Sequence, residues 1–316
     1  MIGVFALMLS VLSKKWISWK IQNIVLIIIV VLSTVSYAKS NVYKNTEEFY
    51  GTAIKHNKEN SLAHYNRGIA RSKTNNIQGA LDDFSNAISY GHKEALLNRG
   101  ALKQVMGDSA GAMEDFNSVI FHNDDDDLVY SSLYNRGMLK YTIGNLTGAM
   151  EDFDRIISYS NDDELVYRTR YNRGVLKHTI GDLTGAMEDF DRVISYNNKD
   201  VAAYSARGAL KIQMRDFSGA ISDFDNVIKL ENNNIDAYTN RSVAKGRMGN
   251  FNEAMNDINM ALRIDSNNAE VYYSRAALYW YFGDNEKALQ DCERVLKIEP
   301  EHKLANQLKN HILTNQ

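Results

Sequence analysis

Residues 134–153 read YNRGMLKYTIGNLTGAMEDF, and residues 171–190 read YNRGVLKHTIGDLTGAMEDF. Two nearly identical stretches of this kind indicate an internal repeat, and a period of about 20–50 residues is typical of solenoids. Weaker copies of the opening Tyr-Asn-Arg-Gly string extend the pattern in both directions. The residue after each Arg is used here as the anchor of a copy. The anchors are Gly68, Gly100, Gly137, Gly174, Gly208, Ser242 and Ala276.

Two further positions keep a constant distance from the anchor. An Ala stands twelve residues after every anchor, and an aromatic or other apolar residue stands four residues beyond that Ala. The Ala residues are Ala80, Ala112, Ala149, Ala186, Ala220, Ala254 and Ala288. The following residues are Phe84, Phe116, Phe153, Phe190, Phe224, Ile258 and Cys292. A constant internal offset in seven copies predicts seven structural units of one kind.

Each copy is predicted to form two helices joined by a tight turn. Apolar residues precede the turn at helical spacing, as in Tyr134, Met138 and Tyr141. Gly144 can end the first helix because glycine adopts the left-handed conformation, and Asn145 can cap the second helix. The small anchor and the Ala let the two helices approach closely, so the aromatic fills the seam beside them.

The period of 34 residues, the helix–turn–helix unit and the small–small contact followed by an aromatic resemble the tetratricopeptide-repeat (TPR) family. The resemblance covers about residues 43–302. It implies an all-α fold, a right-handed helical-repeat solenoid of antiparallel helix pairs. We therefore expect seven repeats within residues 61–302. Their limits are 61–92, 93–129, 130–166, 167–200, 201–234, 235–268 and 269–302.

The two ends of the predicted solenoid differ from its middle. Residues 39–60 align with a second helix alone and predict an N-terminal half-repeat. Residues 303–316 predict a polar-faced capping helix, which solenoids need because the last repeat has an uncovered face. The second and third steps between anchors are 37 residues long, which predicts a longer loop or an added first turn on the next helix.

The composition excludes several classes of protein. A single Cys permits no intramolecular disulfide and no multi-thiolate metal site. A formal net charge of −3 gives no basic field for nucleic acid. The seven His residues form no metal-binding spacing, and the acidic run at residues 124–127 lacks the alternation of a calcium loop. We expect no cofactor, no metal and no small-molecule substrate.

The first 38 residues carry the features of a secretory signal peptide. Three Lys precede the apolar run at residues 24–32, and small residues lead to Ala38. We expect cleavage after Ala38, export, and a periplasmic or secreted protein. Cleavage would lower the formal net charge from −3 to −6, because residues 1–38 contain three Lys and no acid. The alternative is a retained membrane anchor at residues 21–35, which would allow membrane contact through residues 1–38 and make the protein a membrane-tethered assembly factor.

One short string resembles a catalytic motif. Residues 107–111 match the Gly-x-Ser-x-Gly elbow and would make Ser109 a hydrolase nucleophile. That elbow requires a strand before the Ser, whereas a helix is predicted here. We therefore predict a non-enzymatic protein, with the hydrolase as the weaker alternative.

An Arg before each anchor and an Asp before each seam aromatic recur in all seven copies, as in Arg173 with Asp189. We interpret this as a ladder of partly buried ion pairs that fixes the register of the helices. The residues serve structure rather than binding.

The predicted binding surface is the concave face, which the first helices line in the family that the chain resembles. Helical spacing assigns to it the residue three before each anchor and those one, four and five after. The candidate groove residues are Tyr134, Met138, Tyr141, Tyr171, Val175, His178, Tyr273, Trp280 and Tyr281. Aromatic side chains on such a face are typical of a protein-binding surface.

We therefore expect a protein–protein interaction scaffold that binds a peptide or protein segment in the cell envelope. The overall negative charge favours a neutral or basic ligand. The family's clamp for an acidic C-terminal peptide uses a Lys three before the anchor and an Asn one after it. Asn135 and Asn172 match one element of the clamp. The Lys and the Asn one after the anchor are absent, so that ligand is not expected.

Overall fold

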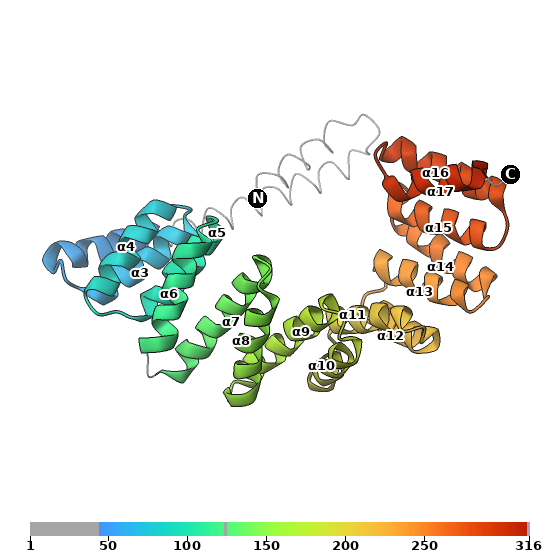
Figure 1. Cartoon of the computed structure of the whole chain (residues 1–316). Helices are drawn as coiled ribbons and strands as arrows, with labels where there is room; N and C mark the ends of the chain where they lie inside the picture. The colour runs from blue at the N-terminus through green and yellow to red at the C-terminus, as the bar shows by residue number, and fades with distance from the viewer. Residues whose placement is uncertain (1–43, 123–124, 315–316) are drawn as a thin grey trace. The chain divides into compact units, whose positions relative to one another are not determined.

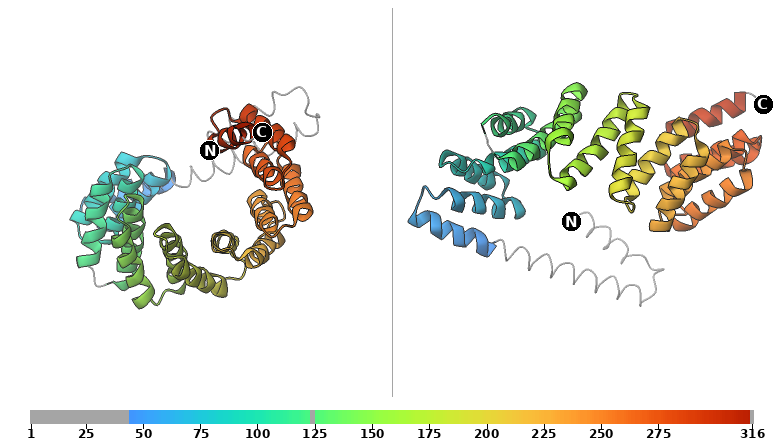
Figure 2. Two further views of the ribbon diagram at one scale, coloured as in Figure 1. Left: turned by 45° about the vertical axis from the view of Figure 1, so that its right-hand side comes forward. Right: turned by 90° about the horizontal axis from the view of Figure 1, so that it is seen from below.

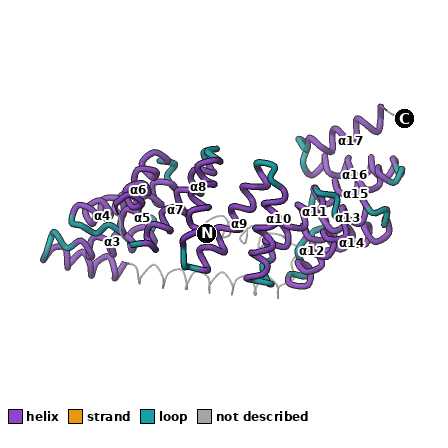
Figure 3. Tube along the Cα trace, turned by 60° about the horizontal axis from the view of Figure 1, so that its bottom comes forward, coloured by secondary structure: helices purple, strands orange, loops and turns teal. Residues whose placement is uncertain are grey.

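The computed structural model describes residues 44–122 and 125–314. Every regular element in these two stretches is helical, and neither contains a strand (Figure 3). The described part of the chain divides after residue 143 into two compact units, which are described separately. Figure 1 labels their helices. The predicted all-α repeat fold is confirmed.

Among its described residues, the first unit contains a helix over residues 44–56 and five further helices. These are α3 (Ser61–Lys73), α4 (Ile77–Ser89), α5 (Glu94–Val105), α6 (Ser109–His122) and α7 (Asp126–Thr142). α3 packs against α4 and α5 against α6, so each predicted pair is a helix hairpin. The first helices α5 and α7 also contact each other, which places them in one layer.

The second unit continues the same arrangement. Its helices are α8 (Leu146–Tyr159), α9 (Asp163–Thr179), α10 (Leu183–Tyr196), α11 (Val201–Gln213), α12 (Phe217–Leu230), α13 (Ile235–Arg247), α14 (Phe251–Ile264), α15 (Ala269–Tyr281), α16 (Asn285–Ile298) and α17 (Lys303–Thr314). Within this unit α9, α11, α13, α15 and α17 contact one another in order and form a continuous layer of first helices (Figure 2).

The turn inside each hairpin has the predicted chemistry. Gly181 adopts a φ of +86°, and Asp182 accepts a hydrogen bond at 2.9 Å from the backbone N–H of Gly185. Glycine adopts this conformation without strain, and the carboxylate satisfies an N–H that the helix start leaves unpaired. Asn75 and Arg215 take the glycine position in two copies, with φ of 64°.

The seam between paired helices explains why the anchor is small. A Cβ atom placed on Gly208 would lie 2.8 Å from Cζ of Phe224, and one on Gly68 would lie 2.7 Å from Phe84. The ring therefore occupies the space of the missing side chain. In the last two copies the anchor is Ser242 or Ala276, and the ring is replaced by a smaller residue, Ile258 or Cys292.

The two longer copies add a turn to the next first helix. α7 and α9 have 17 residues, whereas α11, α13 and α15 have 13. Each long helix starts at an Asp cap: Asp125 accepts from the N–H of Leu128, and Asp162 accepts from Leu165. The alternative of an added first turn is therefore confirmed.

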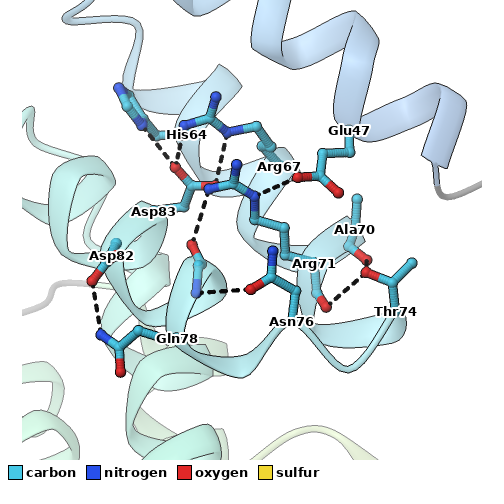
Figure 4. A network of polar contacts seen from close by, with 11 residues as sticks. Glu47, His64, Arg67, Ala70, Arg71, Thr74, Asn76, Gln78, Asp82 and Asp83 are labelled. Atoms are coloured by element: carbon cyan, nitrogen blue, oxygen red, sulfur yellow. Dashed lines mark hydrogen bonds and ion pairs between the residues drawn. The ribbon is translucent and has the colours of Figure 1, made fainter.

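The Arg–Asp ladder is confirmed within both units. In the first repeat Arg67 donates two hydrogen bonds to the buried Asp83, at 2.8 and 2.6 Å, and Arg71 and His64 also contact that carboxylate (Figure 4). The same two-point contact recurs in five further copies. The pairs are Arg99–Asp115, Arg173–Asp189, Arg207–Asp223, Arg241–Asp257 and Arg275–Asp291.

The ladder also joins neighbouring repeats, which the sequence interpretation missed. The remaining nitrogen of Arg207, Nη1, donates to Asp191 of the preceding second helix at 2.6 Å. Arg173 reaches Asp154 and Arg241 reaches Asp225 in the same way. The last member is Lys309 of α17, which donates to Glu293 at 3.1 Å. The capping helix α17 therefore takes the place of a first helix, and its own residues Ala305 and Ile312 are buried.

Candidate functional site

The predicted signal peptide or anchor, residues 1–38, lies outside the described residues. Among the helices that are described, none has both the length and the apolar character needed to cross a membrane.

The residues of the hydrolase motif lie at the turn between α5 and α6. Gly107 has a φ of +84°, and Asp108 accepts a hydrogen bond at 2.9 Å from the N–H of Gly111. Ser109 begins α6 directly after this turn. Because α5 precedes the turn, the strand that a nucleophile elbow requires is replaced by a helix.

The structure gathers no metal-binding cluster of His, Cys, Asp and Glu side chains in residues 44–122 and 125–314. Three residues of the acidic run lie at the start of α7. Asp125 caps the helix, and Asp126 and Asp127 lie in its first turn. Cys292 is buried, as its seam position predicts, and burial raises the pKa of its thiol to about 11.

The three candidates on α7 are all partly exposed. Tyr134, Met138 and Tyr141 are each half-buried on a helix whose fully buried face carries Leu133, Gly137 and Leu139. Their side chains therefore lie at the border between the packed face and the surface of the first unit.

Two of the three candidates on α9, Tyr171 and Val175, contribute to the core of the second unit. The ring of Tyr171 lies 5.9 Å from the ring of Phe190, and burial raises the pKa of its phenol. Val175 packs against the same cluster. His178 is exposed, and its Nε2 lies 2.7 Å from Oε1 of Gln213 on α11. His178 is thus the α9 candidate that faces solvent, and it bridges two first helices.

The candidates on α15 form the best-defined site. Trp280 and Tyr281 are 41% and 53% exposed, and together with Tyr273 they line a pocket of about 240 Å³ between α13 and α15. The ring of Trp280 stands edge-on to His311 of α17, with centroids 5.4 Å apart. Tyr273 is half-buried, and its ring lies 5.3 Å from His302. Exposed aromatic rings around a concavity can bind an apolar side chain.

The opposite wall of this pocket was missed by the sequence interpretation. Val243, Gly246 and Arg247 of α13 line it, and the guanidinium of Arg247 lies 5.5 Å from the ring centre of Tyr281. The signal was present in the sequence, because Gly246 stands four residues after its anchor, where the other copies have a side chain. A glycine inside a helix weakens it and usually has a packing or functional reason.

These features define a helical repeat protein in whose second unit the first helices form a continuous layer. Tetratricopeptide-repeat models match residues 167–200, 235–268 and 269–302, limits that coincide with three of the predicted repeats. The chain therefore contains tetratricopeptide repeats. No curated protein sequence matches it.

Solved structures support the same fold. A tetratricopeptide-repeat protein from Parabacteroides merdae aligns with a TM-score of 0.58 at 18% identity, over 80% of this chain and 98% of that one. MamA from Desulfovibrio magneticus aligns with a TM-score of 0.50 at 15% identity, over 55% of this chain and 96% of that one. At these identities the likeness concerns the fold alone.

Proposed function

We propose that this protein is a non-catalytic scaffold that binds an extended peptide or protein segment along the face formed by its first helices. The fold supports protein–protein interaction in general, since helical repeats present long surfaces rather than enclosed active sites. The observation that carries the specific proposal is the pocket between α13 and α15, where Trp280 and Tyr281 stay exposed. Large aromatic side chains that remain exposed beside a pocket are typical of binding hot spots.

The binding proposal is tested by comparing two pairs of substitutions. Trp280→Ala with Tyr281→Ala removes the aromatic wall of the pocket. Tyr159→Ala with Tyr196→Ala removes two rings that are also exposed but lie at the ends of second helices. We expect a partner captured from native extract to be lost from the first variant and retained by the second, with equal melting temperatures. Loss from both variants, or from neither, would contradict the proposal.

The proposed location is the cell envelope after export, and the support is the sequence of residues 1–38. N-terminal sequencing of the protein recovered from an envelope fraction is the test. A chain beginning at Lys39 supports cleavage, and a chain that keeps residues 21–35 supports the membrane-tethered assembly factor. Recovery of the protein in the cytoplasm with its intact N-terminus would overturn both.

A further inference from the structure

Two pockets of this protein are built from the same positions of the repeat. One lies between α13 and α15, as described above. The other, of about 460 Å³, lies between α3 and α5 in the first unit. Seven positions of the repeat line both pockets. They pair as Ile69 with Val243, Ser72 with Gly246, Lys73 with Arg247, Asn98 with Ser274, Ala101 with Ala277, Leu102 with Leu278, and Val105 with Tyr281.

Both pockets occur where the repeat has small side chains at two facing positions. Four residues after the anchor stand Ser72 and Gly246, whereas the other copies carry Gln104, Tyr141, His178, Ile212 and Trp280. One residue after the next anchor stands Ala101 in one pocket and Ala277 in the other. Leu278 packs directly on Gly246, where a Cβ would lie 2.5 Å from its Cδ1, and both residues line the pocket between the two first helices.

The pair α9 and α11 shows what a larger residue does at this position. His178 occupies the place that Gly246 has in α13, and it reaches Gln213, which occupies the place of Tyr281. That contact spans the gap between the two helices. Gly246 has no side chain that could reach across, and the ring of Tyr281 is met instead by the guanidinium of Arg247, 5.5 Å from its centre.

Each pocket also has a cation at its rim and an apolar wall. The cation comes five residues after the anchor, as Lys73 in one pocket and Arg247 in the other. No acidic side chain lines either pocket. Opposite the cation lie Val105, which is 82% exposed, and Tyr281, which also stacks against Arg247. A ligand that satisfies both features combines an apolar group with a negative charge.

We infer that the pocket between α13 and α15 binds a bulky apolar side chain of a peptide whose neighbouring residue carries a carboxylate, and that the pocket between α3 and α5 is a second site of the same chemistry. This inference rests on the proposed peptide-binding function. The apolar side chain lies between Val243 and Ala277, and the carboxylate meets Arg247.

Size and charge support this assignment. The pocket between α13 and α15, at about 240 Å³, is below the roughly 300–1,000 Å³ of pockets that enclose a whole small ligand, so a single side chain suits it. The pocket between α3 and α5, at about 460 Å³, has room for a larger apolar group. The overall negative charge of the chain favours a neutral or basic ligand, but the local cation is closer to the bound group. Exposed charges interact mainly within about 10 Å at ordinary ionic strength, so Arg247 decides the preference. The contact differs from the family's C-terminal clamp, because its cation comes from the end of the first helix.

The test starts with a phage-displayed library of short random peptides selected on the purified protein. The strongest binder is then synthesised with a fluorescent label, and its affinity is measured by anisotropy for wild type, four single variants and the double variant Lys73→Glu with Arg247→Glu. Arg247→Glu reverses the charge at the rim, and Ala277→Leu fills the pocket. Lys73→Glu reverses the charge at the rim of the pocket between α3 and α5. Lys229→Glu is the matched control, since this exposed lysine lies on the second helix α12.

We expect the selected peptides to carry Leu, Phe or Trp beside Asp or Glu. Arg247→Glu and Ala277→Leu should each weaken binding about tenfold. The double variant Lys73→Glu with Arg247→Glu should lose the remaining binding at the second pocket. Lys229→Glu should have no effect on the affinity. Melting temperatures confirm that the variants are folded.

Two results would overturn the inference. Peptides that bind Arg247→Glu and Ala277→Leu as tightly as wild type would place the site elsewhere on the protein and leave the proposed function standing. Selected peptides rich in Lys and Arg would reverse the charge preference. A library that gives no binder at all would count against the proposed function as well, which separates the two failures.

Discussion

Arg207 holds Asp223 through two parallel hydrogen bonds, from Nε at 2.9 Å and from Nη2 at 2.5 Å, within a single repeat. Its third nitrogen donates to Asp191 of the preceding repeat. The hydrogen bonds to Asp223 raise the pKa of the guanidinium above its ordinary value, so the arginine stays charged throughout the accessible pH range. One side chain thus connects the two helices of its own hairpin with the hairpin before it.

The two carboxylates that Arg207 contacts should differ widely in their contribution to stability. Asp223 is 2% exposed and Asp191 is 55% exposed. Asp223→Ala leaves Arg207 and Lys211 without their buried partner, so we expect a loss of about 3–5 kcal/mol. Asp191→Ala removes a solvent-exposed pair and should cost less than about 1 kcal/mol. Urea unfolding of both variants checks this, and equal losses would contradict the assigned roles.

The close contact between Gly208 and Phe224 predicts a dependence between these two positions. Gly208→Ala places a Cβ where the ring lies, so we expect a loss of about 1–3 kcal/mol despite the better helix propensity of Ala. In the background of Phe224→Ile, which copies Ile258 beneath Ser242, the same substitution should cost little. A double-mutant cycle by urea unfolding measures the difference. An identical cost in both backgrounds would show that the ring does not occupy the anchor's space.

The buried alanines of the second helices predict intolerance to larger side chains. Ala186 is fully buried between its hairpin partners, so Ala186→Leu should destabilise the protein by about 1–3 kcal/mol through overpacking. Ala202 of α11 is exposed, and Ala202→Leu serves as the control. Thermal melts should give a lower melting temperature for Ala186→Leu than for Ala202→Leu. A wild-type melting temperature for Ala186→Leu would show that Ala186 does not lie in the packed seam.

Cys292 predicts a loss of stability at alkaline pH. Burial raises the pKa of its thiol from 9.0 to about 11, so between these values the folded protein keeps a proton that the unfolded chain releases. The free energy of unfolding therefore falls as pH rises through this window, by up to about 3 kcal/mol. Cys292→Ala should flatten the pH dependence relative to wild type. Unchanged slopes in urea titrations would show that the thiol does not contribute.

Labelling of the same thiol reports on opening of the last repeat. Because Cys292 is buried, we expect it to react slowly with iodoacetamide in the folded protein and quickly in urea. Fast labelling of the native protein, at the rate of a free thiol, would show that the packing of α16 against α15 and α17 does not protect it.

The sequence by itself determined the helix hairpins and the residues of their seams. Gly174, Ala186 and Phe190 recur at offsets that only two closely packed helices explain, and the turn residues Gly181 and Asp182 have one obvious structural role each. Arg173 and Asp189 could be paired for the same reason, because both belong to one hairpin. These are local relationships, separated by fewer residues than one repeat, and helical geometry alone is sufficient to predict them.

The tertiary structure decided what happens between neighbouring hairpins. Tyr171 was predicted to line the groove, yet it also packs on Phe190, because the exposure of a first-helix residue depends on the side chains of the next repeat. The link from Arg207 to Asp191 and the pocket beside Gly246 both arise from contacts between repeats. A periodic sequence specifies which face a residue occupies. Whether a residue on that face fills a gap or leaves one open depends on the partner across the interface, which only the packed structure shows.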